Sequence, residues 1–119
     1  MAGVRQVART PEELEALFED AFVLRDAAAV ARLFEARALL VAGGLAGEAR
    51  GNGKIALSAP GLWAHDCTYV ADPRRVVQAN DIALVLAAQG TNVARRGSDG
   101  AWRYAISLLS TDHPNQEAQ

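Results

Sequence analysis

This sequence has few of the residues that cross-link small proteins or bind metal ions. It contains one cysteine, Cys67, so no disulfide can form within the chain. Its two histidines, His65 and His113, form none of the spacings typical of metal ligands with that cysteine. We therefore expect no metal ion and no other cofactor.

Excess basic charge and long apolar runs are also lacking. Twelve Lys and Arg residues against 14 Asp and Glu give a net charge of −2, which argues against nucleic-acid binding. No apolar run approaches the ~20 residues of a membrane-spanning helix, and the first residues lack the apolar core of a signal peptide. We expect a cytoplasmic protein that binds neither nucleic acid nor membrane.

The N-terminal part carries the clearest structural pattern. Thr10, Pro11 and Glu13 form the N-cap, first position and capping box of a helix. An apolar stripe follows at helical spacing, comprising Leu14, Leu17, Phe18, Ala21 and Phe22, whereas Glu12, Glu15 and Glu19 fall off it. Asp26 is placed to cap a second helix over 27–35.

The rest of the chain has the pattern of strands. A short strand is expected at 38–42 and a helical segment or turn at 54–59, followed by long strands at 67–79, 82–96 and 101–110. Pro73 indicates a bulge or a sheet edge. At 119 residues, half of them hydrophobic, the chain suits one domain over 10–112 with flexible termini at 1–9 and 113–119.

Turns at 80–81 and 97–100 predict which strand residues share a face of the sheet. The bulkier face should meet the helices and carries Thr68, Val70, Asp72, Gln89, Thr91, Val93, Trp102, Tyr104, Ile106 and Leu108. The opposite face should pair two copies in a homodimer, through Cys67, Tyr69, Asn92, Ala94, Ala105, Ser107 and Leu109. A bulge at Pro73 would invert the assignment upstream of it.

Several short segments follow one another at characteristic spacings. They are Thr10-Pro11-Glu12, Arg25-Asp26, Leu33-Phe34-Glu35, Gly51 and the run DGAWRY at 99–104. In their order and spacing the chain resembles the SnoaL-like branch of the nuclear-transport-factor-2-like superfamily. The resemblance implies an α+β fold, a cone in which a curved, mostly antiparallel sheet wraps around N-terminal helices and encloses a pocket. It also implies frequent dimerisation through the sheet. Because the superfamily includes isomerases, cyclases, dehydratases, hydrolases and binding domains, its fold alone says little about function.

Ketosteroid isomerase, a member of this superfamily, provides a sharper comparison. The resemblance aligns its oxyanion-stabilising tyrosine with Phe18 and its general-base aspartate with Ala42. Phe18 has no hydroxyl to donate and Ala42 cannot take a proton. The reaction is therefore not expected with that catalytic pair.

The remaining candidates lie on the predicted inner face. We expect the pocket wall to comprise Phe18, Phe22, Trp63, Val70, Gln89, Thr91, Tyr104, Ile106 and Leu108. Asp72 is the only carboxylate placed inside, where burial would raise its pKa and suit it to acid–base catalysis. Alternatively, the bend at Pro73 turns Asp72 towards solvent. His65 and Cys67 could share a face, but no third group of a catalytic triad is evident.

These observations favour a small domain that binds an apolar or weakly polar small molecule. Two alternatives remain open. One is an isomerase, cyclase or dehydratase that uses Asp72 with Gln89 or Tyr104. The other is a purely structural dimerisation module whose interior is filled.

Overall fold

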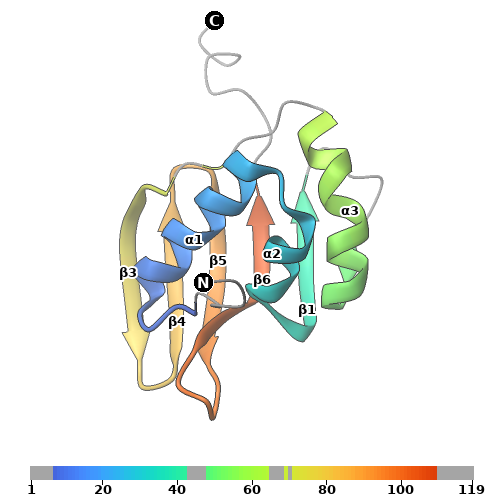
Figure 1. Ribbon diagram of the computed structural model, residues 1–119. Helices are drawn as coiled ribbons and strands as arrows, with labels where there is room; N and C mark the ends of the chain where they lie inside the picture. Colours follow the sequence, from blue (N-terminus) through green and yellow to red (C-terminus); the bar gives the residue numbers. More distant parts are fainter. Residues whose placement is uncertain (1–6, 43–47, 65–68, 70, 110–119) are drawn as a thin grey trace, which may run out of the picture.

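The computed structural model describes residues 7–42, 48–64, 69 and 71–109. They form three helices and six strands, in which the helices lie on one side of the sheet (Figure 1). In chain order the elements are α1 (Pro11–Leu24), α2 (Ala27–Arg32), β1 (Phe34–Ala42), β2 (Ala49–Arg50), α3 (Asn52–Ala64), β3 (Pro73–Ala79), β4 (Ile82–Ala87), β5 (Gly90–Arg96) and β6 (Trp102–Leu109).

The six strands form one curved sheet in the order β2-β1-β6-β5-β4-β3. Every neighbouring pair is antiparallel except β1 and β6, which run parallel. Helix α1 crosses the concave face, and α3 lies alongside β1 (Figure 1). The expected α+β fold, a curved and mostly antiparallel sheet around N-terminal helices, is confirmed.

The predicted helix caps are confirmed. Thr10 Oγ1 accepts a hydrogen bond from the Glu13 amide at 3.0 Å, which begins α1. Arg25 ends α1 in the left-handed conformation, with φ of 51°. Asp26 Oδ1 then accepts from the Ala29 amide at 3.0 Å and caps α2. This second helix is shorter than predicted, because the chain enters β1 at Phe34.

The predicted strand over 82–96 is wrong, because the chain turns back at Ala88-Gln89 and forms two strands, β4 and β5. Gly90 allows the start of β5 to pack closely against β6. A Cβ atom at position 90 would lie 2.6 Å from the carbonyl oxygen of Leu108, closer than any side chain can approach. The predicted turn at 80–81 is confirmed, with Ala79 opposite Ile82.

A β-bulge in β6 reverses part of the predicted face assignment. Val93 pairs with Ile106 and Ala94 pairs with Tyr104, which leaves Ala105 as the extra residue. Tyr104 stays on the inner face as predicted. Ile106 and Leu108 turn outwards, 39% and 46% exposed, so their predicted inner placement is wrong.

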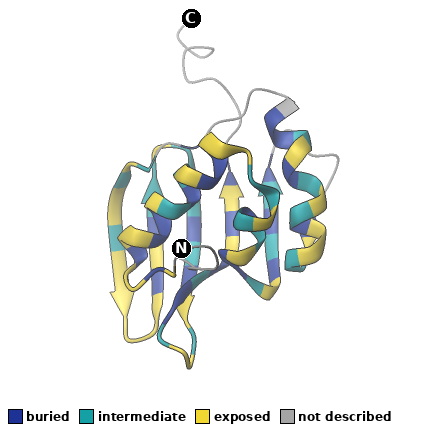
Figure 2. Ribbon diagram, in the orientation of Figure 1, coloured by how far each residue is buried: buried dark blue, intermediate teal, exposed yellow. Residues whose placement is uncertain are grey.

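The predicted dimer face is also wrong. Its described members are buried inside the molecule, and they are Tyr69, Asn92, Ala94, Ala105, Ser107 and Leu109. Buried residues concentrate where the sheet faces α1 (Figure 2). Asn92 pairs with Ser107 across β5 and β6, and both side chains point towards that helix.

Candidate functional site

Five hydrogen-bonded side chains lie inside the fold between α1 and the sheet. This interior polar cluster consists of Glu15, Tyr69, Asn92, Tyr104 and Ser107. Glu15 is fully buried, as are Asn92, Tyr104 and Ser107, and Tyr69 is 2% exposed. Helix α1 supplies the carboxylate, and the sheet supplies Asn92, Tyr104 and Ser107.

The Glu15 carboxylate is the centre of the cluster. The Tyr69 hydroxyl donates to Glu15 Oε1, and the Tyr104 hydroxyl donates to Oε2. Asn92 Nδ2 donates to Oε2 at 3.0 Å and lies 3.1 Å from the Tyr69 oxygen. Ser107 Oγ donates to Asn92 Oδ1 at 2.6 Å and so orients that amide. Three hydrogen-bond donors thus converge on one buried carboxyl group.

The charge of Glu15 acts on both tyrosines. Burial first, and then the negative charge of Glu15, raise the pKa of Tyr69 and of Tyr104 well above the ordinary value for tyrosine. Both hydroxyls therefore stay protonated and act as donors near neutral pH.

Aromatic rings enclose this cluster on the helix side. The Phe18 ring centroid lies 4.6 Å from that of Tyr69 and 5.1 Å from those of Tyr104 and Phe22. Phe22 in turn meets Trp63 edge-on at 6.1 Å. Trp63 Nε1 is buried and has no hydrogen-bond partner among the described residues. Among the described side chains, this indole nitrogen is the buried polar atom that lacks a hydrogen bond.

Sequence reasoning missed Glu15 because it placed the stripe of α1 too far round the helix. The buried residues of α1 are Pro11, Leu14, Glu15, Phe18, Ala21 and Phe22. Pro11, Glu15, Phe18 and Phe22 follow the spacing i, i+4, i+7 and i+11, which is a helical stripe in its own right. The signal was present, but a glutamate inside it is read as solvent-facing by default.

Four predicted pocket residues lie in the interior, and they are Phe18, Phe22, Trp63 and Tyr104. Thr91 lies on the outer face opposite Leu108, and Gln89 lies in the turn between β4 and β5. Ala42 is buried at the end of β1. Val70, His65 and Cys67 lie outside the described residues.

Asp72 does not lie in the interior. Its side chain is 58% exposed and its carboxylate lies 3.7 Å from the Arg74 guanidinium. The prediction of an inward, desolvated carboxylate at this position is wrong. The alternative, in which the chain turns Asp72 to solvent before Pro73, is the one the structure has.

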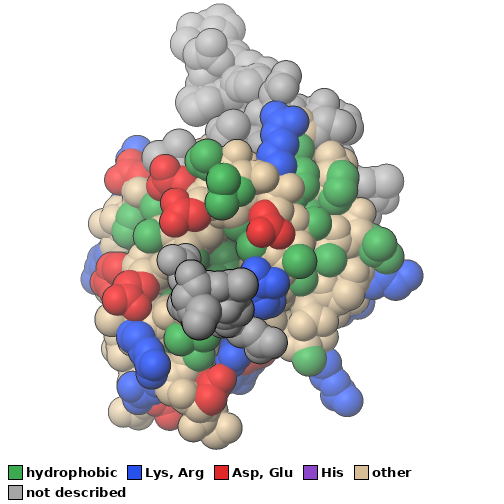
Figure 3. All heavy atoms as spheres, in the orientation of Figure 1, with side chains coloured by type: hydrophobic (Ala, Val, Ile, Leu, Met, Phe, Trp, Pro, Cys, Tyr) green, Lys and Arg blue, Asp and Glu red, His purple; other side chains and the backbone are tan. Residues whose placement is uncertain are grey.

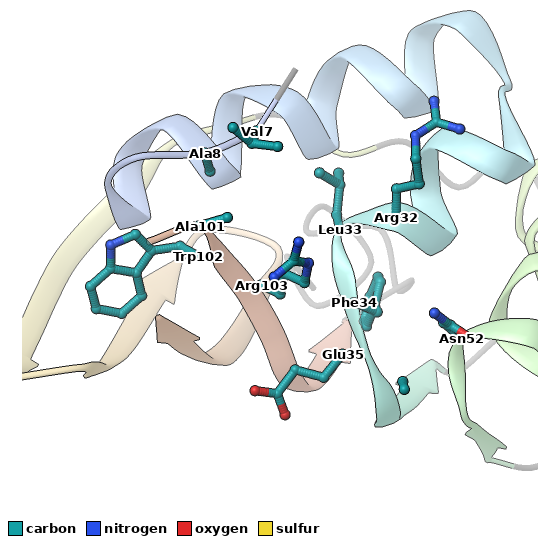
Figure 4. Close-up of a pocket in the computed structure, with 11 residues that line it drawn as sticks. Val7, Ala8, Arg32, Leu33, Phe34, Glu35, Asn52, Ala101, Trp102 and Arg103 are labelled. Carbon is teal, nitrogen blue, oxygen red and sulfur yellow. The ribbon is translucent and has the colours of Figure 1, made fainter. Parts of the chain in front are cut away.

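A separate cavity of about 470 Å³ opens on the surface, where the chain before α1 meets the starts of β1 and β6 (Figure 4). Its polar lining consists of Arg32, Glu35, Asn52 and Arg103. Glu35 accepts from Arg95 at 2.9 Å, and Arg103 donates to Asp99 at 2.9 Å. Two of the four polar side chains are thus already paired.

On the helical side of the surface, the described residues show no concentration of one charge (Figure 3). Acidic and basic side chains are interspersed over the helical face of the molecule (Figure 3). In the described part of the chain, no group of three or more His, Cys, Asp or Glu side chains could hold a metal ion. None of the described helices is long and apolar enough to cross a bilayer.

No protein-family model matches this sequence, and no curated protein matches it significantly. Solved structures do resemble it. A ketosteroid-isomerase-like protein from Erwinia carotovora atroseptica is 18% identical with a TM-score of 0.69, over 87% of this chain and 94% of its own. An NTF2-like protein with a cystatin-like fold from Novosphingobium aromaticivorans is 19% identical with a TM-score of 0.66, over 90% and 82%.

A third structure comes from Streptomyces avermitilis and is a protein proposed to be a dehydratase of the NTF2-like family. It is 18% identical, with a TM-score of 0.63, over 84% of this chain and 92% of its own. At these identities the likeness concerns the path of the backbone rather than the residues of a site. The chain therefore has the fold of the nuclear-transport-factor-2-like superfamily.

Proposed function

We propose that this protein binds a small, weakly polar molecule in its interior, and that the interior polar cluster meets the polar group of that ligand. The observation that carries the proposal is the fully buried Glu15 carboxylate, set among aromatic rings. A buried carboxylate costs folding free energy even when it is hydrogen-bonded, and such groups concentrate at functional sites.

Two further features support a ligand in this region. Trp63 Nε1 is a buried donor without a partner among the described residues, and an acceptor on a ligand would satisfy it. The aromatic rings around Phe18 offer a hydrophobic surface for the body of the ligand. The surface cavity at Arg32 and Asn52 shares none of these residues.

An enzyme of the isomerase, cyclase or dehydratase kind is the second candidate, with Glu15 in place of Asp72. The observation that favours it is the convergence of two tyrosine hydroxyls and one carboxylate. A carboxylate can take a proton from a substrate, and protonated tyrosines can donate to the oxyanion that forms. Of the similar structures, one is a ketosteroid-isomerase-like protein and another is a protein proposed to be a dehydratase.

Native mass spectrometry of the purified chain tests the binding proposal. We expect an added mass that is released on denaturation and is lost in Glu15→Gln, which keeps the shape of the side chain but removes its charge. The matched control is Asp72→Asn, the same change at the exposed carboxylate, and it should keep the added mass. Equal retention in both variants would contradict the proposal. Turnover of the released molecule by the wild type but not by Glu15→Gln would favour the enzyme.

We also propose that the protein is a cytoplasmic homodimer, formed by the opposite face of the sheet from the one predicted. This outer sheet face consists of Val77, Ile82, Leu84, Leu86, Val93, Ile106 and Leu108. Five of these apolar side chains, on β3, β4 and β6, are between 38% and 46% exposed, and Val93 on β5 joins Leu84 to Ile106. A second copy would cover such a patch with an equivalent patch.

A further inference from the structure

We propose that the ligand of the interior is a protonated amine, whose ammonium group bonds to Glu15 Oε1. This inference rests on the proposed function, because it names the class of molecule that the same site would take.

Charge is the first argument. Glu15 is surrounded by neutral donors, and among the described residues no lysine or arginine is paired with it. The arginines that do form ion pairs in this part of the chain bind other carboxylates, on Glu35, Glu48, Asp72, Asp81 and Asp99. An ammonium ion would bring a positive charge to this carboxylate, and a charge-assisted hydrogen bond is roughly twice as strong as one from a neutral donor.

A second carboxylate on the same side of α1 adds to this field. Glu19 lies one helical turn after Glu15 and is half-buried, and its Oε1 accepts from the Ala71 amide at 2.8 Å. Two negative groups therefore face the segment that contains Tyr69 and Ala71. An anionic ligand would be repelled here, and a neutral ligand would bring no counter-ion to Glu15.

The aromatic rings are the third argument. The Phe18 ring centroid lies 4.6 Å from that of Tyr69 and 5.1 Å from that of Tyr104, and both pairs are tilted rather than parallel. Phe22 and Trp63 extend the same cluster. Ring faces attract cations through their quadrupole, most strongly where water is excluded. Aromatic rings beside a carboxylate thus suit an amine with a hydrocarbon body.

The two oxygens of the Glu15 carboxylate differ in which elements hold their hydrogen-bond donors, and this difference indicates which oxygen an ammonium group would reach. Asn92 and Tyr104, the donors to Oε2, lie on the adjacent strands β5 and β6. Tyr69, the donor to Oε1, lies between α3 and β3, outside any helix or strand. An entering ammonium would therefore replace the Tyr69 hydroxyl on Oε1, while the two strands keep holding Oε2.

Three small probes that share one ring separate charge from shape, namely cyclohexylamine, cyclohexanol and cyclohexanecarboxylate. We would measure their binding to the full-length protein by calorimetry near neutral pH. We expect cyclohexylamine to bind at least about tenfold more tightly than cyclohexanol, and the carboxylate not to bind. Glu15→Gln should remove the preference for the amine, and Asp72→Asn should leave it unchanged. Tyr69→Phe, which frees Oε1, should bind the amine at least as tightly as the wild type.

Other results would overturn the inference in distinguishable ways. Cyclohexanol binding as tightly as the amine would refute the amine and leave the proposed small-molecule function standing. Amine binding that survives in Glu15→Gln would place it at a surface carboxylate and refute the assignment to this site. If none of the three binds and no molecule co-purifies, the proposed function fails as well. The ratio of amine to alcohol affinity in the wild type decides the charge preference even if Glu15→Gln does not fold.

Discussion

The two faces of the sheet differ in polarity, and in the opposite sense to the usual one. The inner face, covered by α1, carries Asn92 and Ser107 at the centre of β5 and β6 and places them against a buried carboxylate. The outer face carries Leu84, Ile106 and Leu108 in the open. A sheet covered on one side has, as a rule, apolar side chains inside and polar ones outside.

This reversal indicates where each face obtains its partner. Polar groups inside a fold cost free energy unless they bond to each other or to a ligand, and the interior polar cluster supplies most of those bonds itself. Exposed apolar side chains gain free energy only when another surface covers them. The inner face therefore suits small-molecule chemistry, and the outer face suits a second copy of the chain. The predictions below test this division, beginning with the largest effect.

The largest effect is expected at Phe18, which is fully buried and contacts four other rings. Phe18→Ala should lower the free energy of unfolding by about 3–5 kcal/mol, because it opens a cavity that these rings cannot easily fill. Urea unfolding followed by circular dichroism measures the loss. The control is Leu57→Ala on α3, where the side chain is 77% exposed and the change should stay within about 0.5 kcal/mol. Equal losses at the two positions would mean that the inner face is not the core.

Local sequence signals predicted the helical part well. Thr10 and Asp26 form their caps through hydrogen bonds with residues three positions away, and Pro11 occupies the first helical position, so neighbours in sequence suffice to predict them. The resemblance of scattered segments predicted the fold, and the order of helices and strands agrees with it.

The site could not be predicted, because it depends on contacts between distant residues. The extra residue at Ala105 in β6 has no local signature, yet it decides that Ser107 points inwards and Ile106 outwards. The turn at Ala88-Gln89 lacks the Asn-Gly pair that marks a hairpin, so one long strand was predicted there. Glu15 accepts hydrogen bonds from Asn92 and Tyr104, which lie 77 and 89 positions away in the sequence, and no pattern within α1 predicts those partners.

The second prediction tests the outer sheet face. Leu84 lies opposite Val77 on one side and Val93 on the other, near the middle of that face. If two copies pair there, Leu84→Asp would bury an unpaired charge in the interface and weaken the dimer by about 100-fold, or about 2.7 kcal/mol. Sedimentation equilibrium of the wild type and the variant measures this.

Leu57→Asp is the matched control for the outer face, because it makes the same substitution, with the same change of charge, at an exposed position on α3. It should leave the association unchanged. A wild type that sediments as a monomer at tens of micromolar would contradict the homodimer, and the outer face would then need another partner.

The third prediction weakens the inner face without opening a large cavity. Asn92→Ala removes the 3.0 Å donor to Glu15 Oε2 and leaves Ser107 Oγ without its acceptor on Asn92. Because these groups are buried, the free energy of unfolding should fall by about 2 kcal/mol. Ser107→Ala, which removes only the outermost bond of the cluster, should cost less. If both changes cost nothing in urea unfolding, the cluster does not stabilise the fold as a connected unit.

The smallest effect is expected at a carboxylate on the surface, in contrast to the buried Glu15. Asp99 accepts from Arg103 at 2.9 Å and from the Ala101 amide at 3.1 Å. The bond from Arg103, followed by that from Ala101, lowers the pKa of Asp99 from 3.8 to about 2. A pKa lowered on folding contributes stability above the ordinary pKa, and that contribution disappears as the pH falls through the folded value. The contribution of Asp99 should thus be present above about pH 4 and lost towards about pH 2.

Since the Asp99 carboxylate is exposed, solvent and salt screen its interaction with Arg103. We therefore expect Asp99→Asn to lower the Tm slightly at neutral pH and low salt. The Tm should not change at about pH 2, where the carboxyl group is protonated, or at about 1 M salt, where its charge is screened. A Tm difference that persists at low pH would show that the loop at 97–100 depends on the shape of Asp99 rather than on its charge.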